Sequence, residues 1–175
     1  MDYKESVLKS EEKIVFLLRS LYQSFGYRQY KMSKFEEYDL YAGNKDFLIS
    51  ENVITFTDTN GKLMALKPDV TLSIVRNTRD TSATVSKVFY DENVYRISKG
   101  THAFREILQT GLECIGEIDD YYIGEVLYLA ARSLASITER YLLTVSHLGI
   151  ISGLLHPLGL SAEEQKAALR LIGLK

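Results

Sequence analysis

Arg105, Gln109 and Glu113 recur at every fourth position of the segment REILQTGLECI, residues 105–115. Successive side chains of a β-strand point to opposite faces, so these three would share one face, each ~13 Å from the next at ~3.3 Å per residue. Gly111 lies between the last two and would leave room above the sheet. A guanidinium, an amide and a carboxylate around such a gap predict the floor of a pocket for a small polar ligand.

The same residues have a simpler interpretation. An antiparallel sheet often has one solvated face, and Arg105 and Glu113 could project into water there. The alternation of residues leaves both interpretations open. The segment VYRI at 94–97 predicts the partner strand, joined to segment 105–115 by a polar loop.

Asp69 and Thr71 lie in a second stretch of interest, LKPDVT at 66–71. Pro68 holds Lys67 extended and cannot continue a strand ladder, so a strand should end here and a helix should follow. Both side chains would then lie at the first turn of that helix. Capping is the simpler role for each of them, because such a side chain can accept hydrogen bonds from free backbone N–H groups, worth about 1 kcal/mol.

The elements that would position these residues follow from periodicity and turn signals. Apolar residues at helical spacing predict helices, alternating runs predict strands, and Asn60-Gly61 predicts a hairpin turn. Together they predict an α+β fold, an antiparallel sheet flanked by helices, in a single domain over residues 1–175. The predicted elements are helices at 11–25, 121–141, 148–156 and 163–172, a hairpin at 53–67, a strand at 85–90, a tight turn at 91–93 and a short strand at 142–146.

The long helix at 121–141 should cover the apolar face of the sheet. Its buried stripe is predicted to consist of Ile123, Val126, Leu127, Ala130, Leu134, Ile137 and Tyr141.

Composition excludes several classes of protein. The 175 residues are 46% hydrophobic and 25% charged with a net charge of −2, so no general positive field favours nucleic-acid binding. The single cysteine, Cys114, excludes an intrachain disulfide, and the three histidines lack metal-ligand spacing, so no metal site is expected. No secretory signal or membrane-spanning run is present, so we expect a cytoplasmic protein that does not bind membranes.

Both stretches resemble segments of class II aminoacyl-tRNA synthetases, in the version found in histidyl-tRNA synthetase and its relatives. VYRI followed by FREILQTGLECIG (104–116) is similar to motif 2, and LKPDVT is similar to the segment Leu-Arg-Pro-Glu-x-Thr. This chain departs from the family pattern in having Asp69 for Glu and Lys67 for Arg. It also has Ser98 where motif 2 has an acid, and a shorter loop without proline.

The resemblance implies an amino-acid site. Asp69 and Thr71 would hold the α-amino group, Arg96 would contact an oxyanion, and Gln109 and Glu113 would lie near the amino acid. The complete set of implied binding residues is Asp69, Thr71, Arg96, Arg105, Gln109 and Glu113.

The resemblance implies a class II synthetase-like core, truncated in this sequence because motif 3 is absent. We therefore expect a non-catalytic protein without a cofactor, the regulatory subunit of ATP phosphoribosyltransferase in histidine biosynthesis. Its partners would be the short catalytic subunit of that enzyme and histidine, in a homodimer or hetero-oligomer. The alternatives are an N-terminal catalytic-core fragment of a histidyl-tRNA synthetase and a dimeric domain whose pocket is vestigial. Whether histidine binds is left open by the sequence.

Overall fold

The computed structural model describes residues 7–43, 53–78, 85–98 and 100–173. The chain forms two compact units, Met1–Tyr141 and Leu142–Lys175. The first unit contains two three-stranded sheets, and the second contains helices. The fold is therefore α+β, as predicted.

The first sheet has the strand order β1-β5-β6. Strands β5 (Ser86–Ile97) and β6 (Phe104–Ile115) are antiparallel over their whole length, from Ser86 opposite Ile115 to Ile97 opposite Phe104. The short strand β1 (Arg28–Gln29) pairs with β5 in parallel, so this sheet is mixed rather than purely antiparallel.

The tight turn predicted at 91–93 is wrong, because β5 continues through these residues. Their polarity suggested a turn, but each acidic side chain has a cationic partner in the fold. Asp91 pairs with Arg19 at 2.6 Å and Glu92 pairs with Lys67 at 2.8 Å.

The second sheet has the order β2-β4-β3 and contains the predicted hairpin. Gly61 has a φ of +80°, which glycine adopts without strain, and the Asp58 carboxylate accepts from the backbone N–H of Asn60 and Lys62. One face of this sheet packs against α2, where Tyr41 and Ala65 are buried. The elements of this region are β2 (Phe35–Glu37), α2 (Asp39–Ala42), β3 (Thr55–Thr57) and β4 (Leu63–Leu66).

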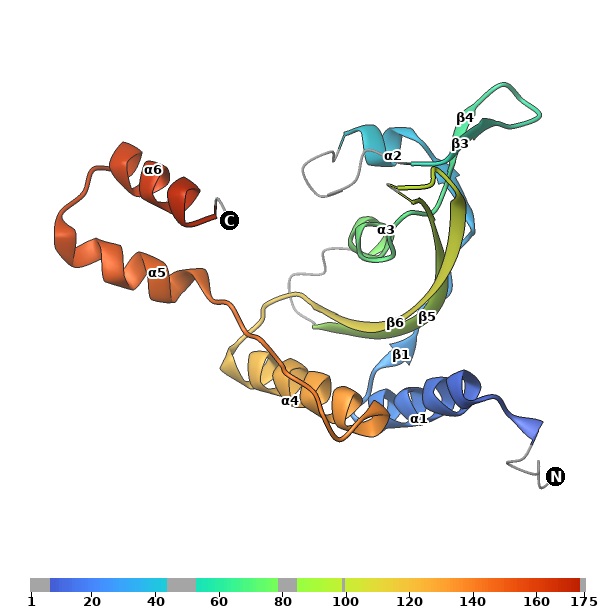
Figure 1. The fold of residues 1–175 in the computed structure, drawn as a ribbon, viewed down its shortest axis with the longest axis horizontal. Helices are drawn as coiled ribbons and strands as arrows, with labels where there is room; N and C mark the ends of the chain where they lie inside the picture. Colours follow the sequence, from blue (N-terminus) through green and yellow to red (C-terminus); the bar gives the residue numbers. More distant parts are fainter. Residues whose placement is uncertain (1–6, 44–52, 79–84, 99, 174–175) are drawn as a thin grey trace. The chain divides into compact units, whose positions relative to one another are not determined.

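Strands β5 and β6 curve around α3 (Thr71–Asn77), which lies against the concave face of their sheet (Figure 1). Val70 and Ile74 at the start of this helix form a buried cluster with Val94 of β5. Residues directly opposite in an antiparallel pair share a face, so the register defines which side chains belong to the concave face. They are Ser86, Val88, Tyr90, Glu92, Val94 and Arg96 of β5, with Arg105, Ile107, Gln109, Gly111, Glu113 and Ile115 of β6.

Helices α1 (Ser10–Ser24) and α4 (Asp120–Ile137) pack on the opposite side of the sheet, here called the helix-covered face. Leu18 and Tyr22 of α1 form a buried cluster with Phe89 of β5 and Leu129 of α4. The Tyr22 hydroxyl also lies 2.9 Å from the Ser133 hydroxyl, which joins the two helices. Asp119 caps α4 by accepting from the Tyr122 N–H.

The stripe predicted to be buried on α4 is wrong in orientation. Leu129 is fully buried and Glu125 is nearly so, whereas Ile123 and Leu127 are 46% and 38% exposed. Glu125 forms an ion pair with Lys87 of β5 at 2.6 Å, and this contact turns the helix face that contains an acid toward the sheet. Hydrophobic periodicity counts a glutamate as a surface residue, so it could not find this orientation.

The second unit contains α5 (Leu148–Leu155), the short 3₁₀ helix η2 (His156–Leu158) and α6 (Ala162–Gly173). A capping box begins α6, with Ser161 Oγ accepting from Glu164 N at 3.3 Å and Ser161 N donating to the Glu164 carboxylate at 2.8 Å. The strand predicted at 142–146 is wrong, because these residues pair with no strand. None of the helices that the structure describes is long and apolar enough to cross a bilayer.

Candidate functional site

The three residues that recur along β6 share the concave face, as their spacing predicted. Arg105 lies near the hairpin end of the strand, directly opposite Arg96, and Glu113 lies near the other end. Eight residues at ~3.3 Å each separate Arg105 from Glu113 by ~26 Å along the strand. These side chains therefore form a row along the concave face rather than one tight cluster.

Glu113 and Thr71 meet at the α3 end of the row. Thr71 Oγ1 donates a hydrogen bond of 2.6 Å to Glu113 Oε1, which ties the first residue of α3 to β6. Burial raises the pKa of the Glu113 carboxyl, and the nearby Asp69 carboxylate raises it further, while the hydrogen bond from Thr71 acts in the opposite direction. Two acidic groups and a hydroxyl at the start of a helix could bind an ammonium or imidazolium group.

Asp69 has the capping role that the sequence offered as its simpler interpretation. Its Oδ1 atom accepts from the backbone N–H of Leu72 at 3.1 Å. Capping and ligand binding are compatible, because a carboxylate has two oxygens and several lone pairs.

Tyr90 fills the gap that Gly111 was predicted to leave open. The two residues are opposite each other, and a Cβ atom at position 111 would lie 2.6 Å from the Tyr90 hydroxyl oxygen and 2.7 Å from its Cζ atom. Burial raises the pKa of the Tyr90 phenol, and the carboxylates of Glu113 and Asp69 add to this rise. Tyr90 therefore belongs to the acidic end of the row. Its position opposite Gly111 depends on the strand register, which the sequence alone does not give.

The opposite end of the row is cationic. Arg96 and Arg105 are cross-strand partners, and Arg96 Nε donates a hydrogen bond of 3.0 Å to the Pro68 carbonyl. Among the described residues, no carboxylate lies within 4.0 Å of either guanidinium. Like charges directly opposite each other destabilise a sheet, so this end of the concave face is suited to an anion. Lys99 of the connecting loop lies outside the described residues.

A buried ion pair that the sequence did not predict lies between the acidic and cationic ends of the row. Lys67 is fully buried, and its Nζ atom is 2.8 Å from Glu92 Oε2. Glu92 is the cross-strand partner of Gln109 and thus part of the concave face. Lys67 directly precedes Pro68, so this pair lies next to the backbone that Arg96 contacts.

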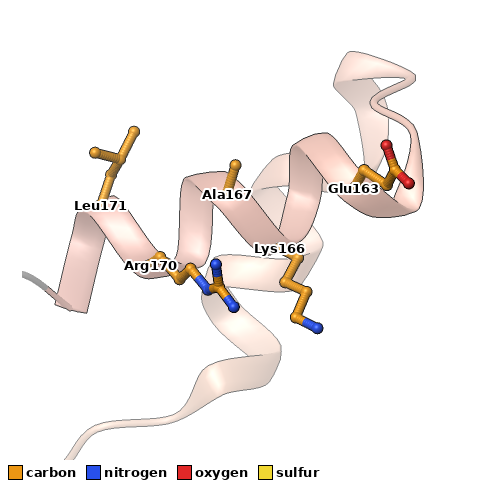
Figure 2. Close-up of a pocket in the computed structure, with 5 residues that line it drawn as sticks. All are labelled: Glu163, Lys166, Ala167, Arg170 and Leu171. Atoms are coloured by element: carbon orange, nitrogen blue, oxygen red, sulfur yellow. The ribbon is translucent and has the colours of Figure 1, made fainter.

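A separate pocket in the second unit involves a single helix. Its five lining residues all belong to α6, and Figure 2 shows Lys166 and Arg170 extending along the same side of that helix. No residue of the predicted site contributes to it. In the part of the chain that the structure describes, no three or more His, Cys, Asp or Glu side chains are placed to hold a metal. The pocket-lining residues are Glu163, Lys166, Ala167, Arg170 and Leu171.

Comparison with known proteins identifies the family of this chain. A sequence-family model described as histidyl-tRNA synthetase matches residues 1–175, the whole chain. The chain belongs to the histidyl-tRNA synthetase family.

Two kinds of relative are found at similar identity. The histidine–tRNA ligase of Methanocaldococcus jannaschii is 29% identical over 175 residues, covering 98% of this chain and 42% of the relative. The ATP phosphoribosyltransferase regulatory subunit of Oceanobacillus iheyensis is 26% identical over 173 residues, covering 97% of this chain and 42% of the relative. The chain thus spans about two fifths of the length of these relatives.

Among solved structures, a histidine–tRNA ligase subunit from Alicyclobacillus acidocaldarius is similar in fold and sequence. Its TM-score is 0.67 at 30% identity, covering 95% of this chain and 49% of that one. The α+β arrangement of mixed and antiparallel sheets with helices is therefore that of the class II synthetase core.

Proposed function

We propose that this chain belongs to a regulatory subunit of ATP phosphoribosyltransferase. This subunit would bind the short catalytic subunit, and it would bind histidine on its concave face. The regulatory subunits of Oceanobacillus iheyensis and Ruminiclostridium cellulolyticum are relatives at 26% and 25% identity. Within such a protein, the chain would bind the amino acid and transmit its presence to the partner.

The charges of the concave face support an amino acid as the ligand. Arg96 Nε donates to the Pro68 carbonyl, and Asp69 is the next residue along the chain, so the backbone at 68–69 connects the cationic end of this face to the acidic end. A guanidinium binds a carboxylate through paired hydrogen bonds, and a carboxylate binds an ammonium group. A zwitterionic amino acid offers both groups at a short separation. Glu113 and Gln109 would then contact its side chain.

The observation that carries the regulatory proposal is the small number of cations near Arg96 and Arg105. The connecting loop SKGTHA (98–103) contains one lysine and no arginine, and Ser98 replaces the acid found in the synthetase pattern. Ser98 N instead donates to the Ala103 carbonyl at 2.9 Å and closes the turn. Activation of an amino acid by ATP needs several cations around the phosphates, which favours binding over adenylation for this chain.

The second candidate is the N-terminal part of the catalytic core of a histidine–tRNA ligase. The identity to the Methanocaldococcus jannaschii ligase, 29% over 175 residues, favours it. Histidine-dependent exchange between pyrophosphate and ATP separates the two candidates. The regulatory proposal expects no exchange by the full-length protein, and robust exchange would support the ligase.

The decisive experiment is co-purification with the short catalytic subunit of ATP phosphoribosyltransferase. We expect a complex whose phosphoribosyltransferase activity decreases when histidine is added. Calorimetry with L-histidine should show binding that Glu113→Ala removes, because the substitution deletes the carboxylate of the acidic end. A protein that binds neither the catalytic subunit nor histidine would contradict the proposal and favour a vestigial pocket.

A further inference from the structure

Two buried Lys–Glu ion pairs link elements of the first unit, one on each side of the β5–β6 sheet. Lys67 and Glu92 have side chains 0% and 12% exposed, with 2.8 Å between charged atoms. On the other side, Lys87 and Glu125 are 20% and 5% exposed, with 2.6 Å between charged atoms. The Lys87–Glu125 pair joins α4 to β5 and explains the orientation of that helix. The Lys67–Glu92 pair joins no helix to the sheet, so it does not orient a helix as the Lys87–Glu125 pair does.

Lys67 is attached to its surroundings at three points. Its N–H donates to the Lys34 carbonyl at 3.1 Å, its carbonyl accepts from the Tyr95 N–H at 2.8 Å, and its ammonium pairs with Glu92. The next carbonyl along the chain, that of Pro68, accepts from Arg96 Nε at 3.0 Å. Because Glu92, Tyr95 and Arg96 all belong to β5, these contacts fix residues 67–68 against the strand that carries the arginine.

We propose that Lys67 and Glu92 are positioning residues, which hold the Pro68 carbonyl where it orients the Arg96 guanidinium toward the ligand. This inference rests on the proposed function, in which Arg96 binds the carboxylate of histidine. The Arg96 Nε–H is donated to the Pro68 carbonyl. The two terminal nitrogens of Arg96 can then make paired hydrogen bonds to a carboxylate. A shift of the Pro68 carbonyl would rotate the guanidinium away from that geometry.

A purely stabilising role does not require this pair. Burying an ammonium and a carboxylate costs desolvation free energy, and an apolar pair of similar volume is often equally stable or more stable. Replacing both residues by apolar ones therefore separates a role in stability from a role in orientation. The Lys87–Glu125 pair provides a matched control with the same residue types and similar burial on the helix-covered face.

The test compares two double variants of the full-length protein, Lys67→Met/Glu92→Leu and Lys87→Met/Glu125→Leu. Calorimetry would measure the affinity of each for L-histidine and for histamine, which lacks the carboxylate. We expect the first variant to bind histidine about tenfold more weakly while its affinity for histamine is unchanged. The control variant should bind both ligands as the unsubstituted protein does. Lys67→Arg, which keeps the charge, should retain most of the affinity for histidine.

A second measurement reports on Arg96 without any ligand. The Nε–H of an arginine bound to a carbonyl exchanges slowly with solvent and has its own nitrogen NMR signal. In Lys67→Met/Glu92→Leu we expect this Arg96 signal to shift and to exchange faster, whereas the control variant should leave it unchanged. If the double variant does not fold, Lys67→Met alone replaces it. Glu92 then keeps a cationic neighbour, because Lys31 Nζ lies 3.7 Å from Glu92 Oε1.

The outcomes distinguish this inference from the proposed function. An unsubstituted protein that binds no histidine would contradict the proposed function, and the Arg96 signal would still decide whether the pair positions the guanidinium. An unchanged Arg96 signal in the Lys67 variants would overturn the inference, as would equal losses of histidine and histamine affinity. Equal effects of the two double variants would also overturn it, since they would show a general effect on the fold.

Discussion

On the helix-covered face of β5 and β6, every charged side chain meets a partner from the same chain, whereas Arg96 and Arg105 on the concave face meet no carboxylate among the described residues. Lys87 pairs with Glu125, and Asp91 pairs with Arg19. Glu106 accepts hydrogen bonds from Asn93 at 2.6 Å and from Tyr95 at 2.9 Å.

Under the proposed function, one face of the sheet stabilises the fold and the other binds the ligand. On the helix-covered face, charges are satisfied internally and orient the helices. On the concave face, two arginines are directly opposite each other and pair with no carboxylate among the described residues, which is unfavourable for the protein alone and favourable once an anion is present. A substitution on the first face should therefore change stability without changing ligand binding, and the reverse should hold for charged residues on the second.

The largest expected effect is that of Leu129→Ala, which tests whether the helix-covered face acts only in stability. Leu129 is fully buried between α4, α1 and the sheet, so its truncation leaves a cavity. We expect the free energy of unfolding to decrease by about 2–5 kcal/mol, measured by urea denaturation. Affinity for histidine at low temperature, where the variant is folded, should be unchanged. A loss of affinity in the folded variant would break the contrast between the two faces.

Gly111→Ala should have the next largest effect, on stability and binding together, because it lies on the concave face. A Cβ atom at this position would approach the Tyr90 hydroxyl oxygen to 2.6 Å, so the Tyr90 ring, which interacts with Thr71 and Glu113, must shift. We expect a loss of about 1–3 kcal/mol in the free energy of unfolding, together with weaker histidine binding.

Gly124→Ala on α4 is the control for that substitution, because the added methyl group would have nothing within 4 Å beyond its chain neighbours and the backbone of its own helix. Alanine is favoured over glycine inside a helix, so this variant should be more stable by about 0.5–1 kcal/mol and bind histidine normally. If Gly111→Ala behaved like Gly124→Ala, the Tyr90 ring would not occupy the space above Gly111.

The sequence predicted the residues of the concave face because strand alternation is a local property. Arg105, Gln109 and Glu113 share that face, and the turn at Gly61 also follows from short-range signals. Each depends on a few neighbouring residues, so local chemistry was sufficient to find it.

Features that depend on contacts between distant segments could not be predicted in this way. The strand continues through Asp91 and Glu92 because Arg19 and Lys67, distant in sequence, neutralise them. The orientation of α4 depends on Lys87, and the gap above Gly111 is filled by Tyr90 across the hairpin. A buried charge appears in the sequence as a surface residue, since its partner is not visible there.

The variants Asp69→Asn and Asp119→Asn compare a cap on the concave side with a cap on the helix-covered side, and both should change stability equally little. Asp69 and Asp119 each accept a hydrogen bond of 3.1 Å from a backbone N–H three residues later. Asparagine caps a helix about as well as aspartate, so both variants should stay within about 0.5 kcal/mol of the unsubstituted protein in thermal unfolding. Only Asp69→Asn should weaken histidine binding, because only that residue would hold the ammonium group. Equal affinities in the two variants would restrict Asp69 to capping.

The smallest expected effect is the pH dependence that Glu113 adds to stability. Burial raises the pKa of this carboxyl above its ordinary value of 4.5, so the folded protein holds the proton more tightly than the unfolded chain does. The resulting contribution to stability is present below pH 4.5 and is lost as the pH rises through the raised pKa. Glu113→Gln cannot ionise and should remove this downward slope in urea unfolding measured from pH 4 upward. Thr71→Val should extend the slope to higher pH, because it deletes the hydrogen bond that opposes the rise in pKa. An unchanged slope in Glu113→Gln would mean that Glu113 is as well solvated as a surface carboxylate, and the acidic end of the concave face would then lack the partly buried group that distinguishes it.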